Sequence, residues 1–317
     1  MTLHPVPMMT TGASHTAQQF RMMVKDLARD NQGVTTGLDM KVSQLSTPGA
    51  GVQISDGSAV IAGKVSSVQG HYAAYNIGTD TSVGIAATGG SARSDMIVLR
   101  VEDPEYEGTR DPETDPIVFF EVISNVSSSA TTVPSGYSAI PLARIDLPAS
   151  TATVTNAVIV DLRQVANPRR ERQLLPLFYP GPLVEISGTT ETWQNFPSGV
   201  TYTIAVPAWA SKVRIKWDVG GIRLVDGNIF GELTFQFGTK QAAQAVYIDD
   251  NQGTAPHRYT AVMADTLSLT DTLGAAMRGT NVTLRSRMRP KAGNVGKFGC
   301  DAATTFVADV EFEEGPL

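Results

Sequence analysis

The chain has 317 residues and a formal net charge of −6, with 42% hydrophobic and 18% charged residues. This length favours two domains, and the acidic balance argues against a nucleic-acid binder, which normally presents a basic face. The single cysteine, Cys300, excludes an internal disulfide and a cysteine-rich metal site, and no apolar run approaches the roughly 20 residues that a membrane helix needs.

The N-terminal stretch predicts an arm followed by one helix. Residues 1–12 show no periodicity, so we expect an arm that a partner orders. They also lack the basic region and apolar core of a signal peptide, which favours synthesis in a cytoplasm without export by the usual route. Apolar residues at three- and four-residue spacing predict a helix over residues 14–30, capped by Ser14. Its apolar face suits either core packing or a contact between subunits, and the expected assembly residues are Phe20, Met23, Val24 and Leu27.

Residues 51–63 predict a β-hairpin around which the first half is arranged. Val52 and Ile54 alternate with polar residues, and Asp56-Gly57 is a favoured tight-turn dipeptide. Apolar character in residues 117–123 is nearly continuous, so we expect this strand to be covered on both faces. Further β-prone runs occupy residues 38–42, 96–101, 140–147 and 158–163.

Residues 102–115 form an acidic loop that is interrupted by prolines. Carboxylates at this density suit calcium, which takes six to eight oxygen ligands. The spacing of an EF-hand is absent, however, so a solvated loop is the main interpretation and a calcium site the alternative.

Composition changes after residue 166. Residues 167–182 contain a charged run and then several prolines, which predicts a stiff, extended linker. The arginines in this run are not interleaved with aromatic residues, so we do not expect them to bind nucleic acid. Residues 183–317 repeat short alternating β-prone runs with turn residues between them, which predicts an antiparallel β-sandwich resembling a jelly roll.

The sequence offers no catalytic or metal-binding motif. The four histidines are scattered without zinc spacing, and no nucleophile elbow, phosphate-binding loop or dinucleotide fingerprint occurs. Asp249 and Asp250 more simply form a turn with the Asn and Gly that follow. We therefore expect a protein that is not an enzyme and uses no cofactor or metal.

Aromatic residues in the second half suggest a carbohydrate contact. Trp217 has apolar alternation around it and is expected in the core, whereas Trp193 has polar neighbours and is the better candidate for a ring that stacks on a sugar. Asn195 lies close enough in sequence to bond the hydroxyls of the same sugar. The predicted carbohydrate-binding residues are Trp193 and Asn195.

A set of short segments occurs in a fixed order in the first half. They are the helix before Asn31-Gln32-Gly33, residues 38–44, Pro48-Gly49 ahead of the hairpin, Gly70-His71-Tyr72, residues 93–98 with Val101-Glu102-Asp103, and residues 141–145 ahead of residues 159–163. This ordered set resembles the N-terminal domain of minor tail or baseplate proteins of tailed bacteriophages, particularly those of actinobacterial hosts. The resemblance implies a structural virion protein, often trimeric, whose N-terminal part docks on the tail and whose C-terminal part commonly faces the host.

These observations together predict a mainly β protein. An N-terminal attachment domain spans residues 1–166, a linker residues 167–182, and a distal sandwich residues 183–317. The predicted function is assembly at a phage tail tip, as a homo-oligomer with a trimer favoured and with other tail proteins as partners, plus contact with a host-surface glycan. The alternatives are a hydrolase of cell-wall polysaccharide and a structural spacer without a ligand.

Overall fold

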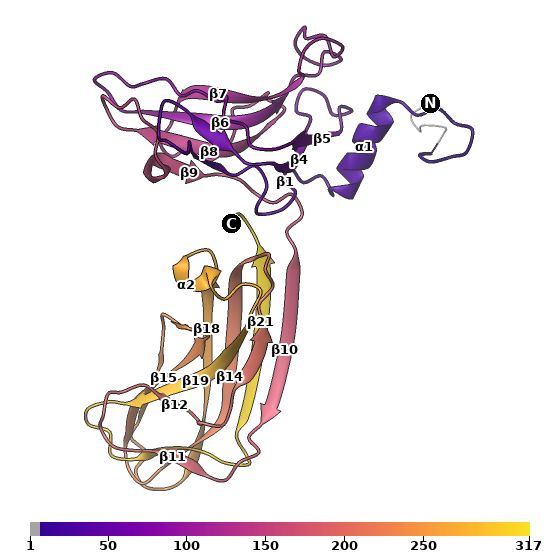
Figure 1. Cartoon of the computed structure of the whole chain (residues 1–317). Coiled ribbons are helices and arrows are strands. Elements are labelled where there is room, and N and C mark those ends of the chain that lie inside the picture. Colours follow the sequence, from indigo (N-terminus) through magenta and orange to yellow (C-terminus); the bar gives the residue numbers. More distant parts are fainter. Residues whose placement is uncertain (1–6) are drawn as a thin grey trace. The chain divides into compact units, whose positions relative to one another are not determined.

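The computed structural model describes residues 7–317, and residues 1–6 of the predicted arm lie outside the described residues. The described chain is mainly β, with antiparallel sheets and one leading helix, which confirms the predicted fold class (Figure 1). The chain divides into two compact units. The N-terminal unit runs to Pro168 and includes Gly315–Leu317, and the C-terminal unit comprises Arg169–Glu314. Neither helix within residues 7–317 is long and apolar enough to cross a membrane.

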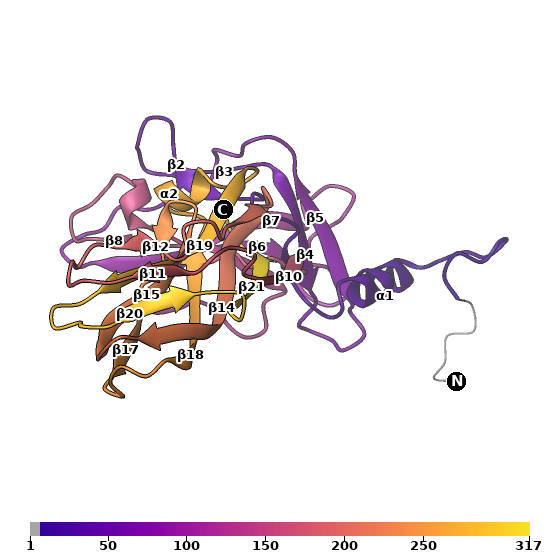
Figure 2. The same ribbon diagram turned by 90° about the horizontal axis from the view of Figure 1, so that it is seen from below.

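The leading helix, α1 (Ala17–Leu27), is shorter than the predicted helix over residues 14–30. Its N-cap is Thr16 and not Ser14, because Thr16 and Gln19 form a capping box in which each side chain accepts from the other residue's backbone N–H. Figure 2 shows α1 at the side of the N-terminal unit, where it packs beside strand β5.

From residue 7 onward, the N-terminal unit contains three small antiparallel sheets. The first consists of β1 (Gly33–Val34), β4 (Gly57–Ala62) and β5 (His71–Asn76). The second pairs β2 (Val42–Gln44) with β3 (Val52–Ile54). The third has the order β7 (Val118–Val126), β6 (Arg93–Val101), β8 (Ala139–Leu147) and β9 (Ile159–Asp161), with the 3-10 turn η1 (Asn156–Val158) before β9.

The predicted hairpin over residues 51–63 is wrong. β3 pairs with β2, whereas β4 pairs with β1 and β5, so Asp56-Gly57 joins strands of different sheets. Gly57 is nevertheless suited to its place, because its φ is +144° and an added Cβ would lie 2.5 Å from the Cβ of Asp39. The glycine therefore reflects a close approach to another segment and not a tight turn between paired strands.

The expectation that residues 117–123 are covered on both faces is also wrong. β7 is an edge strand of its sheet, and its residues are at most half-buried. β6 takes the covered position instead: Ile97 and Leu99 face the main core, and Met96 and Val98 face a second, smaller core. A continuous apolar run does not distinguish an edge strand from a strand that is buried on both faces, because both can be rich in apolar residues.

The C-terminal unit consists of two six-stranded antiparallel sheets. One contains β10 (Arg170–Phe178), β21 (Thr305–Glu314), β14 (Ala210–Val225), β18 (His257–Ser268), β20 (Lys297–Cys300) and β11 (Val184–Ile186). The other contains β12 (Gln194–Asn195), β13 (Tyr202–Ala205), β19 (Asn281–Pro290), β15 (Ile229–Phe237), β16 (Lys240–Gln241) and β17 (Val246–Asp250). A short helix, α2 (Thr272–Ala275), precedes β19.

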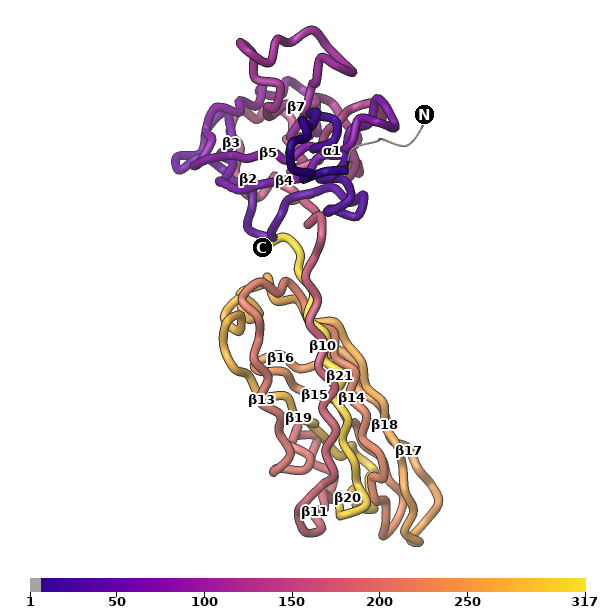
Figure 3. Tube along the Cα trace, turned by 90° about the vertical axis from the view of Figure 1, so that its right-hand side faces the viewer, coloured from indigo at the N-terminus to yellow at the C-terminus, as the bar shows by residue number. Residues whose placement is uncertain are grey.

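The strand order identifies this unit as a jelly roll. One sheet has the order β10-β21-β14-β18, and the other has β13-β19-β15-β17, so the first and last strands of the unit pair with each other (Figure 3). Alternate residues of both sheets fill one core, in which Trp217 is fully buried against Tyr202 and Phe306. The prediction that Trp217 is a core residue is confirmed.

The segment predicted as a linker, residues 167–182, is mainly a strand. β10 pairs with β21 at nine positions from Arg170 to Phe178, because its inward residues, including Leu175 and Leu177, pack against the sandwich core. The end of the chain also differs from the predicted boundary. Leu317 belongs to the N-terminal unit, where its backbone N–H donates to the Gly37 carbonyl at 2.8 Å.

Candidate functional site

Helix α1 is attached to its unit by a buried arginine. Arg21 Nε donates to the Gln69 carbonyl at 2.8 Å, and Nη2 donates to Glu105 Oε2 at 2.7 Å and Tyr106 Oη at 3.0 Å. Asp103 lies 3.4 Å from Nη1. Burial opposes the charge of Arg21, but the bonds to Glu105 and Tyr106 outweigh it and raise the pKa of the guanidinium. The helix therefore docks through a polar anchor.

The apolar stripe of α1 (Phe20, Met23, Val24 and Leu27) is only partly covered by the rest of the N-terminal unit. Phe20 is 48% exposed and Leu27 is 72% exposed, whereas Met23 and Val24 are half-buried. An apolar hollow of about 230 Å³ adjoins the stripe and includes Val24, Leu27 and Val60 in its lining. Of the two interpretations of this face, core packing within the chain is wrong for its exposed members, and a contact with another subunit stays a prediction.

The acidic loop is held by arginines. Arg21 contacts Asp103 and Glu105, Arg110 Nε donates to Glu102 at 3.3 Å, and Arg100 lies 3.6 Å from Glu107. Asp103 is buried, so the loop is not simply solvated as expected. Across residues 7–317 no three His, Cys, Asp or Glu side chains gather in a group that could hold a metal ion.

Both predicted carbohydrate residues lie on one surface of the jelly roll, the outward face of β12, β19, β15 and β17, which we call the Trp193 face. Trp193 immediately precedes β12, and Asn195 is opposite Arg287 of β19. Trp193 is half-buried: the Arg289 guanidinium carbon lies 4.6 Å from its ring centroid, and Arg287 Nη2 donates to its carbonyl at 2.8 Å. Arginines of β19 thus fix both the ring and the backbone of this tryptophan.

Glu232 of β15 is the buried carboxylate of the Trp193 face. It accepts from Arg289 Nε, and its Oε1 lies 3.9 Å from Lys291 Nζ. Burial alone would raise the pKa of Glu232, but the hydrogen bonds from Arg289 and Tyr247 lower it. The hydrogen bond between Tyr247 and Glu232 also raises the pKa of Tyr247. Glu232 is therefore a charged structural partner and not a proton donor at neutral pH.

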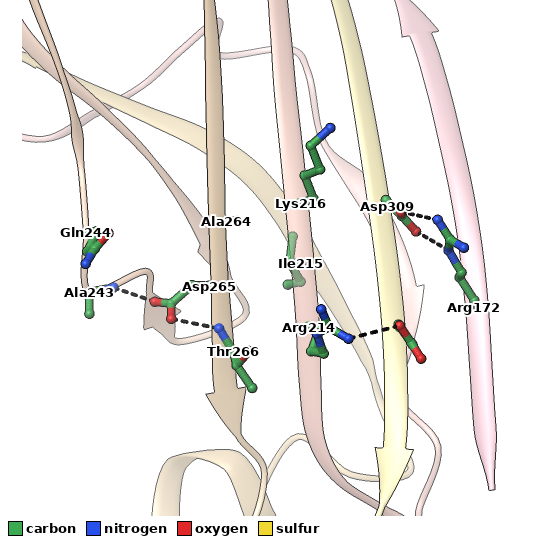
Figure 4. Close-up of a pocket in the computed structure, with 11 residues that line it drawn as sticks. Arg172, Arg214, Ile215, Lys216, Ala243, Gln244, Ala264, Asp265, Thr266 and Asp309 are labelled. Atoms are coloured by element: carbon green, nitrogen blue, oxygen red, sulfur yellow. Dashed lines mark hydrogen bonds and ion pairs between the residues drawn. The ribbon is translucent and has the colours of Figure 1, made fainter.

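The opposite face of the sandwich carries a hollow of about 720 Å³ over β10, β21, β14 and β18 (Figure 4). Basic side chains of β10 and β14 flank acidic side chains of β21 there. Arg172 pairs with Asp309 at 2.5 Å, and Arg214 lies 3.7 Å from Glu311. Because the charges in these ion pairs compensate each other, the pairs leave no uncompensated charge that could attract a ligand to the hollow.

Two other sets of residues that the sequence analysis considered have structural roles. Asp249 and Asp250 end β17, and Asp250 Oδ1 accepts from the Gln252 backbone N–H at 3.0 Å, which is the expected turn. Cys300 is buried, and burial raises the pKa of its thiol to about 12.

Sequence reasoning missed the residues that organise both surfaces. Arg21 carries no local signal, because its partners are far away in the chain. The arginines of β19 do carry one: Arg285, Arg287 and Arg289 alternate along the chain, and residues two apart in a strand share a face.

No protein-family model matches the chain, and no curated protein matches its sequence. Among solved structures, the chain is similar to the VP2 subviral particle of infectious bursal disease virus, with 10% identity, a TM-score of 0.28, and coverage of 95% of this chain and 83% of that one. A structure of the Gx strain of the same virus has 11% identity, a TM-score of 0.24, and coverage of 90% and 79%. The insecticidal delta-endotoxin Cry8Ea1 of Bacillus thuringiensis has 10% identity, a TM-score of 0.22, and coverage of 90% and 52%. These scores are too low to support a statement about fold or function.

Proposed function

We propose that this protein is a structural component of a phage virion that assembles at the tail tip through its N-terminal unit. The observation that carries the proposal is the apolar stripe of α1, in which Phe20 and Leu27 are exposed while the helix is held by Arg21. The ordered segments that resemble minor tail and baseplate proteins give the same direction. The proposed role is not enzymatic.

The occupant of the stripe is a second copy of this chain. The stripe contains four large apolar side chains without an interrupting charge, so its partner must also be apolar, and the same stripe on another copy meets that requirement. Full burial of a large apolar side chain contributes about 1.5–3 kcal/mol, so Phe20 and Leu27 alone would supply a substantial part of an association energy. A trimer is the favoured closed arrangement.

The experiment is a measurement of molar mass by light scattering at micromolar concentrations. The full chain should be oligomeric, and the double variant Phe20→Asp, Leu27→Asp should be monomeric with an unchanged fold by circular dichroism. Ile77→Asp is the matched control, because Ile77 is 96% exposed in the same unit but lies outside the stripe. A monomeric wild-type chain, or an oligomer that survives the double variant, would remove the basis of the proposal.

We further propose that the jelly roll contacts a glycan of the host surface through the Trp193 face. A half-buried indole, with Asn195 nearby and opposite Arg287, combines a ring for stacking with groups that bond hydroxyls. Trp193→Ala should leave stability within about 1 kcal/mol but reduce adhesion to host cells. Trp209→Ala is the control, since Trp209 is also a half-buried indole beneath an arginine, Arg169. Adhesion that survives Trp193→Ala would favour the spacer alternative.

The hydrolase alternative receives no support from this surface. Hydrolysis of a glycosidic bond needs a protonated carboxylic acid beside a second carboxylate. Glu232 is held charged by Arg289, and its lowered pKa makes it a poor acid. Release of soluble sugar from host cell walls by the purified chain would reinstate that alternative.

A further inference from the structure

Three arginines alternate along the outward side of β19, at positions 285, 287 and 289. Only Arg289 has a carboxylate partner, Glu232. Arg285 makes a long, weak hydrogen bond from Nη2 to Thr283 Oγ1 at 3.4 Å, and Arg287 donates to the Gln236 side chain and the Trp193 carbonyl. The Nε atoms of Arg285 and Arg287 are both buried without a hydrogen-bond partner.

This lack of carboxylate partners is unusual within the C-terminal unit. Arginines elsewhere in Arg169–Glu314 form ion pairs, with Arg278 as the other exception; those that do are Arg169, Arg170, Arg172, Arg214, Arg223 and Arg258. On the opposite sheet, arginines are paired with acidic residues. The guanidinium groups of Arg285 and Arg287 have no such partner within residues 7–317, so they add uncompensated positive charge to the Trp193 face.

The two charges also repel each other. Residues two apart in a strand lie about 6.6 Å apart on one face, which is inside the screening length of roughly 10 Å at moderate salt. Burial and the neighbouring charge of Arg285 lower the pKa of Arg287. An anion beside the two guanidinium groups would relieve this repulsion and accept hydrogen bonds from Arg285, whose bond to Thr283 is long, because guanidinium binds carboxylate and phosphate through charge-assisted hydrogen bonds.

We infer that Arg285 and Arg287 bind the carboxylate or phosphate group of an acidic saccharide, whose sugar ring lies toward Asn195 and Trp193. The order along β19 places these groups in one row: Arg285, then Arg287 opposite Asn195, then Arg289 against the Trp193 ring. The inference rests on the proposed contact of the jelly roll with a host-surface glycan, and it specifies that the glycan is anionic.

The test is calorimetric titration of the full chain at low salt with glucuronic acid, glucose 6-phosphate, glucose and inorganic phosphate. At least one acidic sugar should bind about tenfold or more tightly than glucose, consistent with one charge-assisted hydrogen bond, and high salt should remove the difference. Preference for glucuronic acid would identify a carboxylate ligand, and preference for glucose 6-phosphate a phosphate ligand. Equal binding of all three sugars would overturn the inference, as would inorganic phosphate binding as tightly as the acidic sugars.

Two variants locate the site. Arg285→Gln should reduce acidic-sugar affinity by about tenfold without moving Trp193, which Arg285 does not contact in any described bond. Arg287→Gln should have at least the same effect, but it also removes the bond to the Trp193 carbonyl, so Arg285→Gln is the decisive variant. Arg214→Gln, on the opposite sheet and paired with Glu311, is the matched control and should bind as wild type does. Unchanged affinity in Arg285→Gln would refute the assignment.

The outcome is separable from the proposed function. If Trp193→Ala abolishes adhesion to host cells while acidic and neutral sugars bind alike, the host-surface role stands and the anionic ligand does not. If acidic sugars bind through Arg285 but no variant affects adhesion, the site exists and the host-surface role fails.

Discussion

Replacement of Arg21 by Ala tests whether a polar anchor, and not the apolar stripe, holds α1 in place. The substitution removes three hydrogen bonds, including the one to the carbonyl of the buried Gln69, and it takes the arginine away from the buried Asp103, which keeps its bonds from Tyr72 Oη and the Glu105 backbone N–H. Breaking a buried ion pair from one side costs about 3–5 kcal/mol, and an orphaned buried acceptor costs about 1–3 kcal/mol. The two costs overlap, so we expect a total of about 3–5 kcal/mol.

The assay is hydrogen exchange of the backbone amides in α1. Because about 1.4 kcal/mol changes an equilibrium constant tenfold, protection of Ala17–Leu27 should fall by about a hundredfold or more in Arg21→Ala. Lys25→Ala is the control, since Lys25 pairs only with the exposed Asp30 at 3.7 Å and such pairs contribute about 0–1 kcal/mol. If the Arg21 and Lys25 variants lose equal and small amounts of protection, the apolar side of the helix must be packed after all, and the assembly proposal loses its main observation.

Three further predictions concern core packing, ion pairs and strand pairing. Trp217→Ala should cost about 3–5 kcal/mol in denaturant unfolding, while Trp217→Phe should cost less because the indole N–H has no partner; equal costs would contradict this. Asp301 and Asp309 have pKa values lowered chiefly by hydrogen bonds from arginines, so their stabilisation is complete above the unfolded-state pKa of about 3.9 and is lost as the pH falls below it. The measurement is the urea midpoint at pH 5 and at pH 3, about one unit on either side of that pKa. A midpoint that stays the same when the pH is lowered from 5 to 3 would argue against those pairs. Trypsin should cleave after Arg110, in the acidic loop, well before it cleaves after Arg172 in β10, because a paired strand cannot enter a protease site. The measurement is the mass of the first fragments, and a first cleavage after Arg172 would contradict this prediction.

Helix α1 illustrates how far periodicity carries. The spacing of Phe20, Met23, Val24 and Leu27 correctly places these residues on one face of a helix. It does not say whether that face is turned toward the unit or away from it. That depends on Arg21, whose partners Gln69 and Tyr106 are 48 and 85 residues away in the chain.

The mainly β class and most strand positions could be predicted from the sequence alone, because alternation of apolar and polar residues is a local property of each strand. The jelly roll could be predicted for the same reason, because each of its strands buries one face and therefore alternates in polarity. Strand partners were decided only by the tertiary structure: Asp56-Gly57 fitted a hairpin locally, yet β3 and β4 belong to different sheets. The prolines of residues 167–182 likewise suggested a linker, but an edge strand tolerates proline wherever its N–H points away from the neighbour, so β10 pairs along its length.

The two candidate surfaces depend on long-range relations of the same kind. Trp193 and Asn195 were found from their polar neighbours, but the arginines beside them come from β19, some ninety residues further along, and enter through strand pairing. Whether a charged side chain is compensated depends on every element that packs near it. Sequence therefore determines which residues share a face, whereas the pairing of strands and the docking of α1 decide what that face meets, because both are set by contacts between segments distant in the chain.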